Sequence, residues 1–396
     1  MPLYAGVCET NITPWIGTQM TGYGWVPQTS LAIHDELYAR AIVLDDGDRR
    51  VCLLTADILG VSVSLADEIR TLVARAIGTV KAAVMLNCSH THGGPHTGVS
   101  VVGAPDAQYL YALIQTLVGV ATQAASLLIP IHLTYGETSA QIGVNRRLPT
   151  PDGRTILAPN YSGAVFSLTQ NLIVNGADGR TLAMLFSHAC HPTTLDAGNR
   201  SITGDWPGAA VAHLKRKLQK EGADSGIHES ALPLFLQGCC GDIDPVRRGD
   251  WEAMEENGRQ IAESAHAARW NAHGRLDETL SFAETKLQLP VLPSADDAGE
   301  SALSFSIQRL TLGGVSFLGF PAEMFVQYAL DYRTHNNASV FLLGNTNGCL
   351  GYFPTAEEHP RGGYEIDEAH QYYGKPSFSP ECEALVRDAI HSMLAG

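Results

Sequence analysis

The sequence predicts a mixed α/β fold in which a largely parallel sheet forms the core and helices flank it. Apolar runs of strand length alternate along the chain with segments of helical periodicity, an order that is typical of βαβ units. In addition, polar clusters follow directly after several of the apolar runs. Because open α/β sheets bind their ligands at the carboxyl ends of the strands, we expect these clusters to form an active site there.

The first third of the chain shows the alternation most clearly. Its apolar runs are bounded by turn residues, and its helical segments repeat apolar side chains every three to four positions. Asp106 is placed to help the longer helix begin. The expected elements, in order, are strands at 39–44 and 50–54, a helix at 61–77, a strand at 82–86 and a helix at 105–128.

The rest of the chain continues this pattern less regularly. Expected strands lie at 182–186, 232–236, 304–312, 315–320 and 340–343, and expected helices at 206–218, 251–268, 323–333 and 381–394. One plausible linker at 290–299 contains Pro and Asp residues, but the motifs on its two sides need each other. We therefore predict a single domain over residues 1–396.

Composition and charge exclude several classes of protein. A chain of 396 residues with 45% hydrophobic and 17% charged residues is typical of soluble globular proteins with a large core. The net charge of -15 argues against a nucleic-acid partner, which requires clustered Lys and Arg. No apolar run approaches the ~20 residues of a membrane span, and the amino terminus has no signal-peptide pattern. We expect a cytoplasmic protein that acts on a small molecule, with its oligomeric state left open.

Three histidines, His90, His92 and His96, lie within seven residues directly after the apolar run at 82–86. Alternate side chains of a strand share a face, so His90 and His92 are expected to project the same way. Neutral imidazole is the commonest protein ligand for zinc. This segment alone supports a metal-binding pair and a His-rich surface turn equally.

Further polar clusters strengthen the metal-binding interpretation. Each comes just beyond an apolar run, and together they supply several His and Asp side chains to one edge of the expected sheet. The clusters are Asp57, His90 with His92, His188 with His191, Asp242 with Asp244, and Asn345-Thr346-Asn347.

A series of short motifs in a fixed order resembles a known family. The motifs are Asn11-Ile12-Thr13-Pro14, residues 33–41, Ser89-His90-Thr91-His92-Gly93-Gly94-Pro95, Asn145-Arg146, His191-Pro192-Thr193, Gly241-Asp242-Ile243-Asp244-Pro245, Pro321-Ala322-Glu323, Gly351-Tyr352 and Tyr364-Glu365. In this order they resemble the catalytic domain of the neutral/alkaline (non-lysosomal) ceramidases, zinc amidases that cleave N-acyl sphingosines. The resemblance implies a zinc-dependent hydrolase.

The resemblance also implies a set of metal ligands. The first His of the family's H-T-H motif corresponds to His90, and the His before its small/Thr pair corresponds to His191. The Glu of the family's P-G-E-F motif corresponds to Glu323, and the ligand Tyr corresponds to Tyr352. One Zn²⁺ is expected, and a second metal stays open. Two His and one Glu with space for water or substrate also suit a catalytic zinc site on chemical grounds.

Three further residues match family positions near the scissile carbonyl. His92 is expected to hold or protonate the substrate, and Arg146 to stabilise developing negative charge on the carbonyl oxygen. Tyr364 lies twelve residues after Tyr352, where the family pattern has its second active-site Tyr.

The position of the family's nucleophile differs in this chain. The family's G-D-x-S-P-N motif supplies a nucleophilic Ser, whereas this sequence has Asp244 at that position, and no Ser or Thr lies between Gln237 and Val246. We therefore expect direct hydrolysis of an amide or ester by metal-activated water, without a Ser acyl-enzyme, and with Asp244 as general base. Two other roles for Asp244 stay open, namely ligand of a second metal and cap of the turn before Pro245.

Two other differences bear on the substrate. Ceramidases of this family carry a carboxyl-terminal immunoglobulin-like domain, and none is expected in this chain. The family's G-G-P-G-G run is also changed, because His96 follows Pro95. Long-chain ceramide is therefore not the expected substrate. A carbohydrate-active hydrolase or lyase acting on a sugar acid stays open, as does a non-catalytic relative that only binds a metal or ligand.

Overall fold

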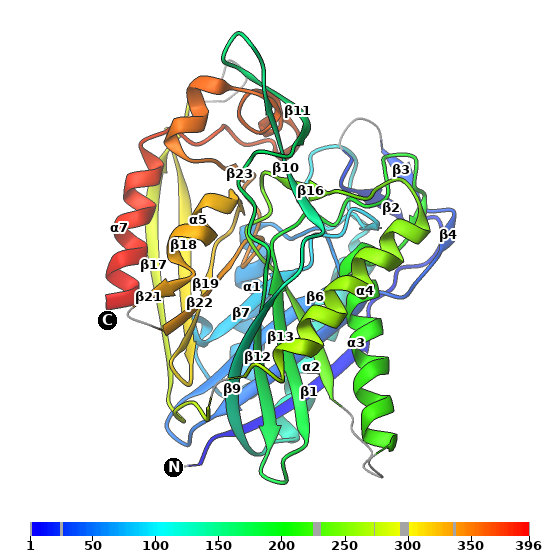
Figure 1. Ribbon diagram of the computed structural model, residues 1–396, viewed down its shortest axis with the longest axis vertical. Coiled ribbons are helices and arrows are strands. Elements are labelled where there is room, and N and C mark those ends of the chain that lie inside the picture. The colour runs from blue at the N-terminus through cyan, green and yellow to red at the C-terminus, as the bar shows by residue number, and fades with distance from the viewer. Residues whose placement is uncertain are drawn as a thin grey trace.

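Two sheets form the centre of the protein, whose computed structural model describes residues 2–23, 27–224, 231–272, 274–293, 301–335 and 338–395 (Figure 1). The larger sheet has eight strands, which in spatial order are β15 (Leu232–Gln237), β13 (Thr181–His188), β12 (Leu168–Gly176), β9 (Ile129–Ser139), β1 (Tyr4–Asn11), β5 (Tyr38–Asp45), β6 (Arg50–Ala56) and β7 (Val84–Cys88). The smaller sheet has five strands, in the order β17 (Leu280–Pro290), β18 (Ala302–Leu312), β19 (Val315–Gly319), β22 (Ala338–Leu343) and β21 (Thr334–His335).

Helices cover the outer faces of both sheets. On the eight-stranded sheet these are α1 (Val63–Ile77), α2 (Ala107–Ser126), α3 (Asp205–Asp224) and α4 (Trp251–Ala268). On the five-stranded sheet they are α5 (Val326–Tyr332) and α7 (Cys382–Ala395), and the short α6 (His370–Tyr373) lies near them in sequence. Figure 1 shows α7 at one side of the molecule, the two sheets in the middle, and α3 and α4 at the opposite side.

Alternating side chains of the eight-stranded sheet pack against different layers. On β5, Ala41 and Val43 join the core beneath α1 and α2, whereas Ile42 and Leu44 join the core shared with the five-stranded sheet. This follows from the two-residue period of a strand, since successive side chains point to opposite faces. Both faces of the sheet are therefore apolar, and its strands read as continuous hydrophobic runs in the sequence.

The mixed α/β class is confirmed, but the expectation of a largely parallel sheet is wrong. Five of the seven pairings in the eight-stranded sheet are antiparallel, and only β6 with β7 and β13 with β15 are parallel. The reason is the length of the connections. Strands β5 and β6 are joined by a short turn, as are β12 and β13, and a short turn allows only antiparallel pairing.

Parallel pairing occurs where a helix connects two neighbouring strands. Helix α1 joins β6 to β7, α3 joins β13 to β15, and α5 joins β19 to β22, which also pair in parallel. These three βαβ units obey the rule from which the sequence argument started. The segments that follow their strands carry the polar clusters, so the expectation of a site at the carboxyl ends of strands is confirmed for them.

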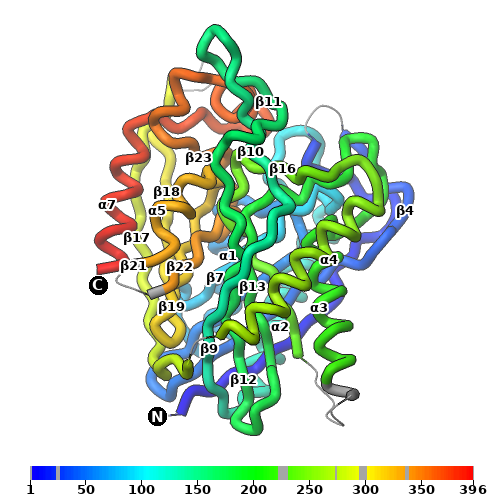
Figure 2. The backbone as a smooth tube through the Cα atoms, viewed as in Figure 1, coloured from blue at the N-terminus to red at the C-terminus, as the bar shows by residue number. Residues whose placement is uncertain are grey.

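Small sheets and short helical turns surround this edge. The small sheets consist of β2 (Gln19–Thr21), β3 (Gln28–Thr29) and β8 (Gly94–Pro95), of β10 (Gly143–Pro149), β11 (Thr155–Asn160) and β16 (Ile243–Pro245), of β4 (Ala32–Ile33) and β14 (Ser201–Ile202), and of β20 (Glu323–Met324) and β23 (Tyr352–Phe353). Single helical turns lie at Lys81–Ala83, Ala356–Arg361 and Tyr364–Glu368. Figure 2 shows β10, β16 and β23 in the half of the molecule away from the N-terminus.

One expected helix has the wrong start. The helix expected at 323–333 begins only at Val326, because Glu323 and Met324 form β20 and pair in parallel with Tyr352 and Phe353. This pairing places Glu323 on an extended segment. The other expected elements are present, with ends that differ by a few residues.

Two further sequence expectations concern the linker and membrane spans. Strand β17 extends to Pro290, and residues 294–299 of the expected linker lie outside the described residues. Over the part of the chain that the structure describes, no helix combines the length and the hydropathy that crossing a bilayer requires.

Candidate metal centre

His90 lies just beyond β7 and presents a free ring nitrogen to the site. Its backbone has a φ of 67°, a conformation that is rare outside glycine and that turns the chain out of the strand. The ring is fully buried, and Nδ1 lies 2.8 Å from the carbonyl oxygen of Leu59. A carbonyl can only accept, so Nδ1 carries a proton and Nε2 is the ring nitrogen that faces the site.

His191 follows β13 and is oriented in the same way. Its Nδ1 lies 3.1 Å from the carbonyl oxygen of Ile243, so Nδ1 again donates to a carbonyl, and Nε2 is the ring nitrogen that faces Glu323. The indole of Trp206 donates to the His191 carbonyl oxygen at 3.0 Å and fixes the backbone behind the ring. Burial, together with the positive charge of Arg146, lowers the pKa of His191 and favours the neutral ring.

Glu323 brings a carboxylate between the two histidines. Its Oε2 lies 2.7 Å from His191 Nε2 and 3.3 Å from His90 Nε2, and the side chain is fully buried. Burial alone raises the pKa of this carboxyl, but the neighbouring His90 and His191 outweigh burial and hold the pKa well below its usual range. The Nε2 atoms of two imidazoles and a carboxylate oxygen therefore converge on one point, and these are the ligand atoms that a divalent metal ion takes.

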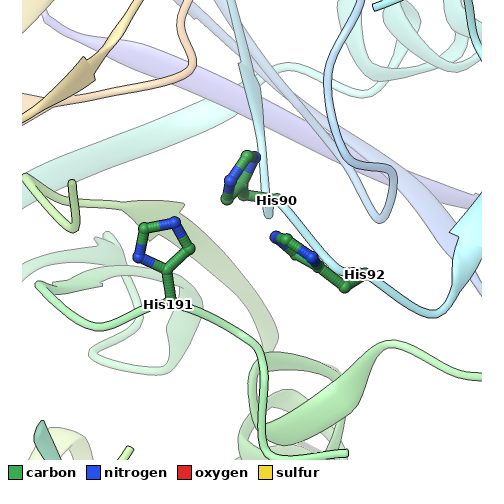
Figure 3. A group of neighbouring side chains, drawn as sticks. All are labelled: His90, His92 and His191. Carbon is green, nitrogen blue, oxygen red and sulfur yellow. The ribbon is translucent and has the colours of Figure 1, made fainter. Parts of the chain in front are cut away.

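His92 completes a cluster of three imidazoles (Figure 3). Its ring centroid is 5.0 Å from that of His90 and 5.9 Å from that of His191. One nitrogen from each of the three rings lies within 4.8 Å of the others, and Figure 3 shows the rings turned toward a common space. The strand argument for this pair is wrong in detail, because β7 ends at Cys88 and both histidines lie in the turn that follows.

The donor atoms of this cluster fit a divalent metal ion. Among the described residues, His90 Nε2 and both ring nitrogens of His92 are buried without a hydrogen-bond partner. Burial lowers the pKa of His92 well below its usual value, so this ring too is neutral. Neutral imidazole nitrogens and a carboxylate oxygen are the ligand set of catalytic zinc sites.

Tyr352 lies beside the cluster. Strand β23 pairs in parallel with β20 and places Tyr352 opposite Glu323. The ring of Tyr352 is 6.3 Å from that of His191, and the guanidinium of Arg146 lies 5.4 Å from the centre of the Tyr352 ring. Burial raises the pKa of the Tyr352 phenol well above its usual value. Its role as a metal ligand stays a prediction.

Two carboxylates hold the guanidinium of Arg146 and leave one of its nitrogens without a hydrogen-bond partner among the described residues. It comes from β10 and donates from Nε to Glu365 Oε1 at 2.8 Å and from Nη1 to Asp244 Oδ1 at 3.1 Å. The guanidinium also lies 5.9 Å from the ring centre of Tyr364, which together with Tyr352 provides an aromatic wall. Its Nη2 is buried and has no hydrogen-bond partner among the described residues, so it can donate to a ligand oxygen.

Asp244 is engaged by two cations and a hydroxyl. Its Oδ1 accepts from Arg146 and, at 3.2 Å, from Thr193 Oγ1, while its Oδ2 accepts from Arg248 Nη1 at 2.6 Å. Burial raises the pKa of this carboxyl, but Arg146 and Arg248 outweigh burial and lower the pKa to about 2. Both oxygens of Asp244 are thus occupied by donors, and these contacts suit an anchor for Arg146 better than a general base. Neither role is tested by the geometry alone.

The neighbouring Asp242 has the opposite character. Burial raises the pKa of Asp242 to about 7. Its carboxyl accepts from the Val326 backbone N–H at 2.7 Å and from Asn145 Nδ2 at 3.0 Å. It therefore ties the segment after Glu323 to the strand that carries Arg146.

Two contributors to the site are missing from the sequence argument. Asn87 is fully buried at the end of β7, where its Nδ2 donates to the Gly344 carbonyl and to Thr346 Oγ1, both at 2.9 Å, and its Oδ1 accepts from the Gln237 backbone at 2.8 Å. It links the ends of β7, β15 and β22. Tyr373 donates its hydroxyl to Glu323 Oε1. The sequence could have indicated Asn87 only as a polar residue in an otherwise apolar strand.

The opening next to the cluster is small and aromatic. A cavity of about 40 Å³ is lined by His92 and by four tyrosines, Tyr352, Tyr364, Tyr372 and Tyr373. A larger cavity, about 380 Å³, lies between the first strands and α3, and Asp57 lines it, but none of the proposed metal ligands does. The candidate site is therefore identified by its converging His and Glu side chains and not by the volume of the cavity beside it.

Comparison with known proteins identifies relatives of this chain. Residues 4–286 match the family of neutral/alkaline non-lysosomal ceramidases, in its N-terminal part. The neutral ceramidase of Mycobacterium tuberculosis is 24% identical over 241 residues, which cover 57% of this chain and 37% of that protein. The neutral ceramidase of Pseudomonas aeruginosa is 23% identical over 334 residues, which cover 75% of this chain and 47% of that protein. The chain thus spans at most about half the length of these relatives.

Solved structures show the same fold. The crystal structure of neutral ceramidase from Pseudomonas aeruginosa superposes with a TM-score of 0.81 at 18% identity, covering 100% of this chain and 74% of that one. A ceramidase complexed with C2 gives a TM-score of 0.80 at 18% identity, covering 98% of this chain and 74% of that one. The family match extends over most of the chain, and the expected resemblance is confirmed. The chain belongs to the neutral/alkaline non-lysosomal ceramidase family.

Proposed function

We propose that the protein is a zinc-dependent hydrolase that cleaves an amide or ester bond of a compact substrate. The observation that carries this proposal is the convergence of His90 Nε2, His191 Nε2 and Glu323 Oε2 in a buried site, with the Nδ1 protons of both rings directed away to carbonyls. His90, His191 and Glu323 would hold the metal, and Tyr352 would complete its ligands. A zinc ion bound there supplies a Lewis acid for the carbonyl and lowers the pKa of water.

The chain's own residues position the substrate around this centre. Arg146 Nη2 donates to the carbonyl oxygen as negative charge develops on it, while Glu365, Asp244 and the aromatic wall keep the guanidinium in place. Neutral His92 accepts a proton from the attacking water and returns it to the leaving group. Tyr364 lies at the cavity wall, where its hydroxyl orients the substrate.

Asp244 argues against a serine acyl-enzyme in this chain. The residue occupies the position at which the family motif has Ser, and both of its oxygens accept hydrogen bonds from neighbouring side chains. We expect direct attack by water, with Asp244 neutralising and orienting Arg146. The general-base role remains the alternative for this residue.

The dimensions of the opening bear on the substrate. Sites for drug-sized molecules usually measure about 300–1,000 Å³, whereas this cavity measures about 40 Å³. His96, which follows Pro95, is buried, and its Nδ1 accepts from the Gly98 backbone at 3.0 Å. A short acyl group fits this geometry better than a long-chain ceramide does.

A graded substrate series tests the proposal. Purified protein is stripped of metal, reloaded with Zn²⁺, and supplied with p-nitrophenyl esters and N-acyl amides of increasing acyl length. We expect hydrolysis that a chelator abolishes and that falls as the acyl chain lengthens. His191→Ala should abolish turnover, whereas His213→Ala, which changes a surface His paired with Glu255, should leave it unchanged. Absence of any chelator-sensitive product would refute the hydrolase.

One observation also favours a carbohydrate substrate. Aromatic rings line the opening, and the unpartnered Arg146 Nη2 is suited to a sugar carboxylate. A lyase would generate an unsaturated uronide, which absorbs ultraviolet light and is detected in the same screen. Formation of this product in place of amide or ester hydrolysis would select this alternative.

A further inference from the structure

The two oxygens of the Glu323 carboxylate have different partners. Oε2 faces the two histidines, at 2.7 Å from His191 Nε2 and 3.3 Å from His90 Nε2. Oε1 accepts a hydrogen bond from the hydroxyl of Tyr373. The family motifs found in the sequence do not include Tyr373, which lies 50 residues after Glu323.

We propose that Tyr373 is a positioning residue that fixes Glu323 as a metal ligand through a single oxygen. A carboxylate is free to rotate and can bind a metal through one oxygen or through both. A donor on Oε1 occupies that oxygen and directs Oε2 toward His90 and His191. This inference rests on the proposed metal centre, because it concerns the geometry of one of its ligands.

The Tyr373 ring is itself held in place. A Cβ on Gly351, which has a φ of 107°, would lie 3.3 Å from Tyr373 Cδ2, so the backbone passes directly against the ring. The ring of Tyr352 packs edge-on, with centroids 6.2 Å apart at 88°. Tyr373 also packs against the small apolar cluster of Leu59, Val99 and Cys349. A donor with so little freedom loses little entropy when it holds the carboxylate.

The arrangement also explains why Tyr373 belongs to the site without being a ligand. Its hydroxyl contacts the oxygen of Glu323 that points away from the imidazole nitrogens. Partners of this kind, which orient a ligand by hydrogen bonding, usually contribute 10–100-fold to metal affinity. The contribution is expected in the binding constant, even before any substrate is present.

Removal of the hydroxyl tests the inference. Tyr373→Phe keeps the ring and deletes the donor, and Zn²⁺ affinity is measured by competition with a chelating dye. We expect the affinity to fall by roughly 10–100-fold, with the unfolding temperature of the metal-free protein little changed. The matched control is Tyr109→Phe, since Tyr109 lies on α2 and its buried hydroxyl donates to the Ile12 carbonyl at 2.7 Å. Loss of this hydroxyl should leave Zn²⁺ affinity unchanged.

A double-mutant cycle shows whether Tyr373 acts through Glu323. In the Glu323→Gln background, Tyr373→Phe should cause little further loss of Zn²⁺ affinity, because the carboxylate to be oriented is gone. Additive losses would overturn the inference. If the Phe variant does not fold, Tyr373→Met fills the same space without a donor and is expected to show the same loss.

The outcomes separate this inference from the proposed function. If the wild-type protein binds no Zn²⁺, the metal centre itself is wrong and the role of Tyr373 is wrong with it. If the wild type binds Zn²⁺ and Tyr373→Phe binds it equally well, the metal centre stands and the positioning role is overturned.

Discussion

Two backbone carbonyls determine which atoms the central histidines present. The carbonyls of Leu59 and Ile243 accept from Nδ1 of His90 and His191, so each ring directs its Nε2 atom toward Glu323. The chemical character of the site is thus determined by main-chain groups that any sequence could supply. For this reason the ligand residues can be proposed from sequence motifs, whereas their tautomers follow only from the structure.

The charge of Asp244 leads to a pH-dependent prediction. Asp244→Asn leaves Arg146 and Arg248 without their shared anion, and removing one partner of a buried ion pair costs about 3–5 kcal/mol. The wild-type carboxyl has a pKa of about 2 in the folded protein, against ~3.9 when unfolded. A lowered folded pKa stabilises the protein above the unfolded pKa, and this stabilisation is lost as the pH falls toward 2.

Urea unfolding at several pH values checks this expectation. The stability difference between wild type and Asp244→Asn should be largest near neutral pH and should shrink below about pH 4. The control is Asp178→Asn, because Asp178 pairs with Arg180 at the exposed surface and its loss should cost little. A difference that stays constant from pH 7 to pH 3 would contradict the assigned pKa.

At the scale of elements, Asn87 joins three strands that belong to two sheets. Its side chain makes hydrogen bonds to the backbone after β22 and to the last residue of β15, while its own backbone belongs to β7. The backbone of Asn87 also forms an isolated bridge with Thr346. The segment that leads into His90 and the turn after β22 are therefore fixed relative to each other by one buried amide. That turn also bonds the segment before Glu323, through the Asn345 N–H and the Ala322 carbonyl.

Truncation of this amide should be costly. Asn87→Ala removes three hydrogen bonds and leaves their buried partners unsatisfied, so we expect a loss of roughly 3 kcal/mol in the free energy of unfolding. Asn175→Ala is the control, because Asn175 also lies on a strand but makes only part-buried contacts, to Thr134 and Thr181 at 3.3 Å. Its loss should stay below about 1 kcal/mol. Equal losses measured by chemical denaturation would show that Asn87 is an ordinary strand residue.

Some elements of the fold could be predicted from the sequence and others could not. The helix expected at 61–77 between two apolar strands is present as α1, because a long amphipathic segment has few alternatives to a crossover helix. Strands β1, β9 and β12 are absent from the prediction, since their residues mix polar and apolar types. Their pairing depends on neighbours that lie far away in the sequence, and no local pattern reports such neighbours.

The residues of the candidate site were likewise predicted only in part. His90, His191, Glu323 and Arg146 come together as the motifs implied, because each follows a strand or lies on a strand whose end is at the same edge. Tyr373 was not predicted, since its only relevant feature is a hydrogen bond to a residue 50 positions away. A side chain that acts through a distant partner has no motif of its own.

At the scale of the whole molecule, the site lies where separate parts of the chain meet. His90 comes from the first third, His191 from the middle, and Glu323 with Tyr352 from the last third. Residues from both sides of the expected linker at 290–299 therefore face the same centre. An ion bound there would link both sheets, so its binding energy would add to the stability of the entire fold.

Metal binding should accordingly be visible in global stability. A ligand that binds only the folded state at 100 times its dissociation constant stabilises by about 2.7 kcal/mol, so Zn²⁺ should raise the unfolding temperature of the metal-free protein by several degrees. His191→Ala removes a buried ligand and should abolish this rise, whereas His213→Ala changes a partly exposed histidine on α3 and should preserve it. A rise that persisted in His191→Ala would place the bound ion elsewhere. Because the measurement needs no substrate, it tests the metal centre independently of the proposed reaction.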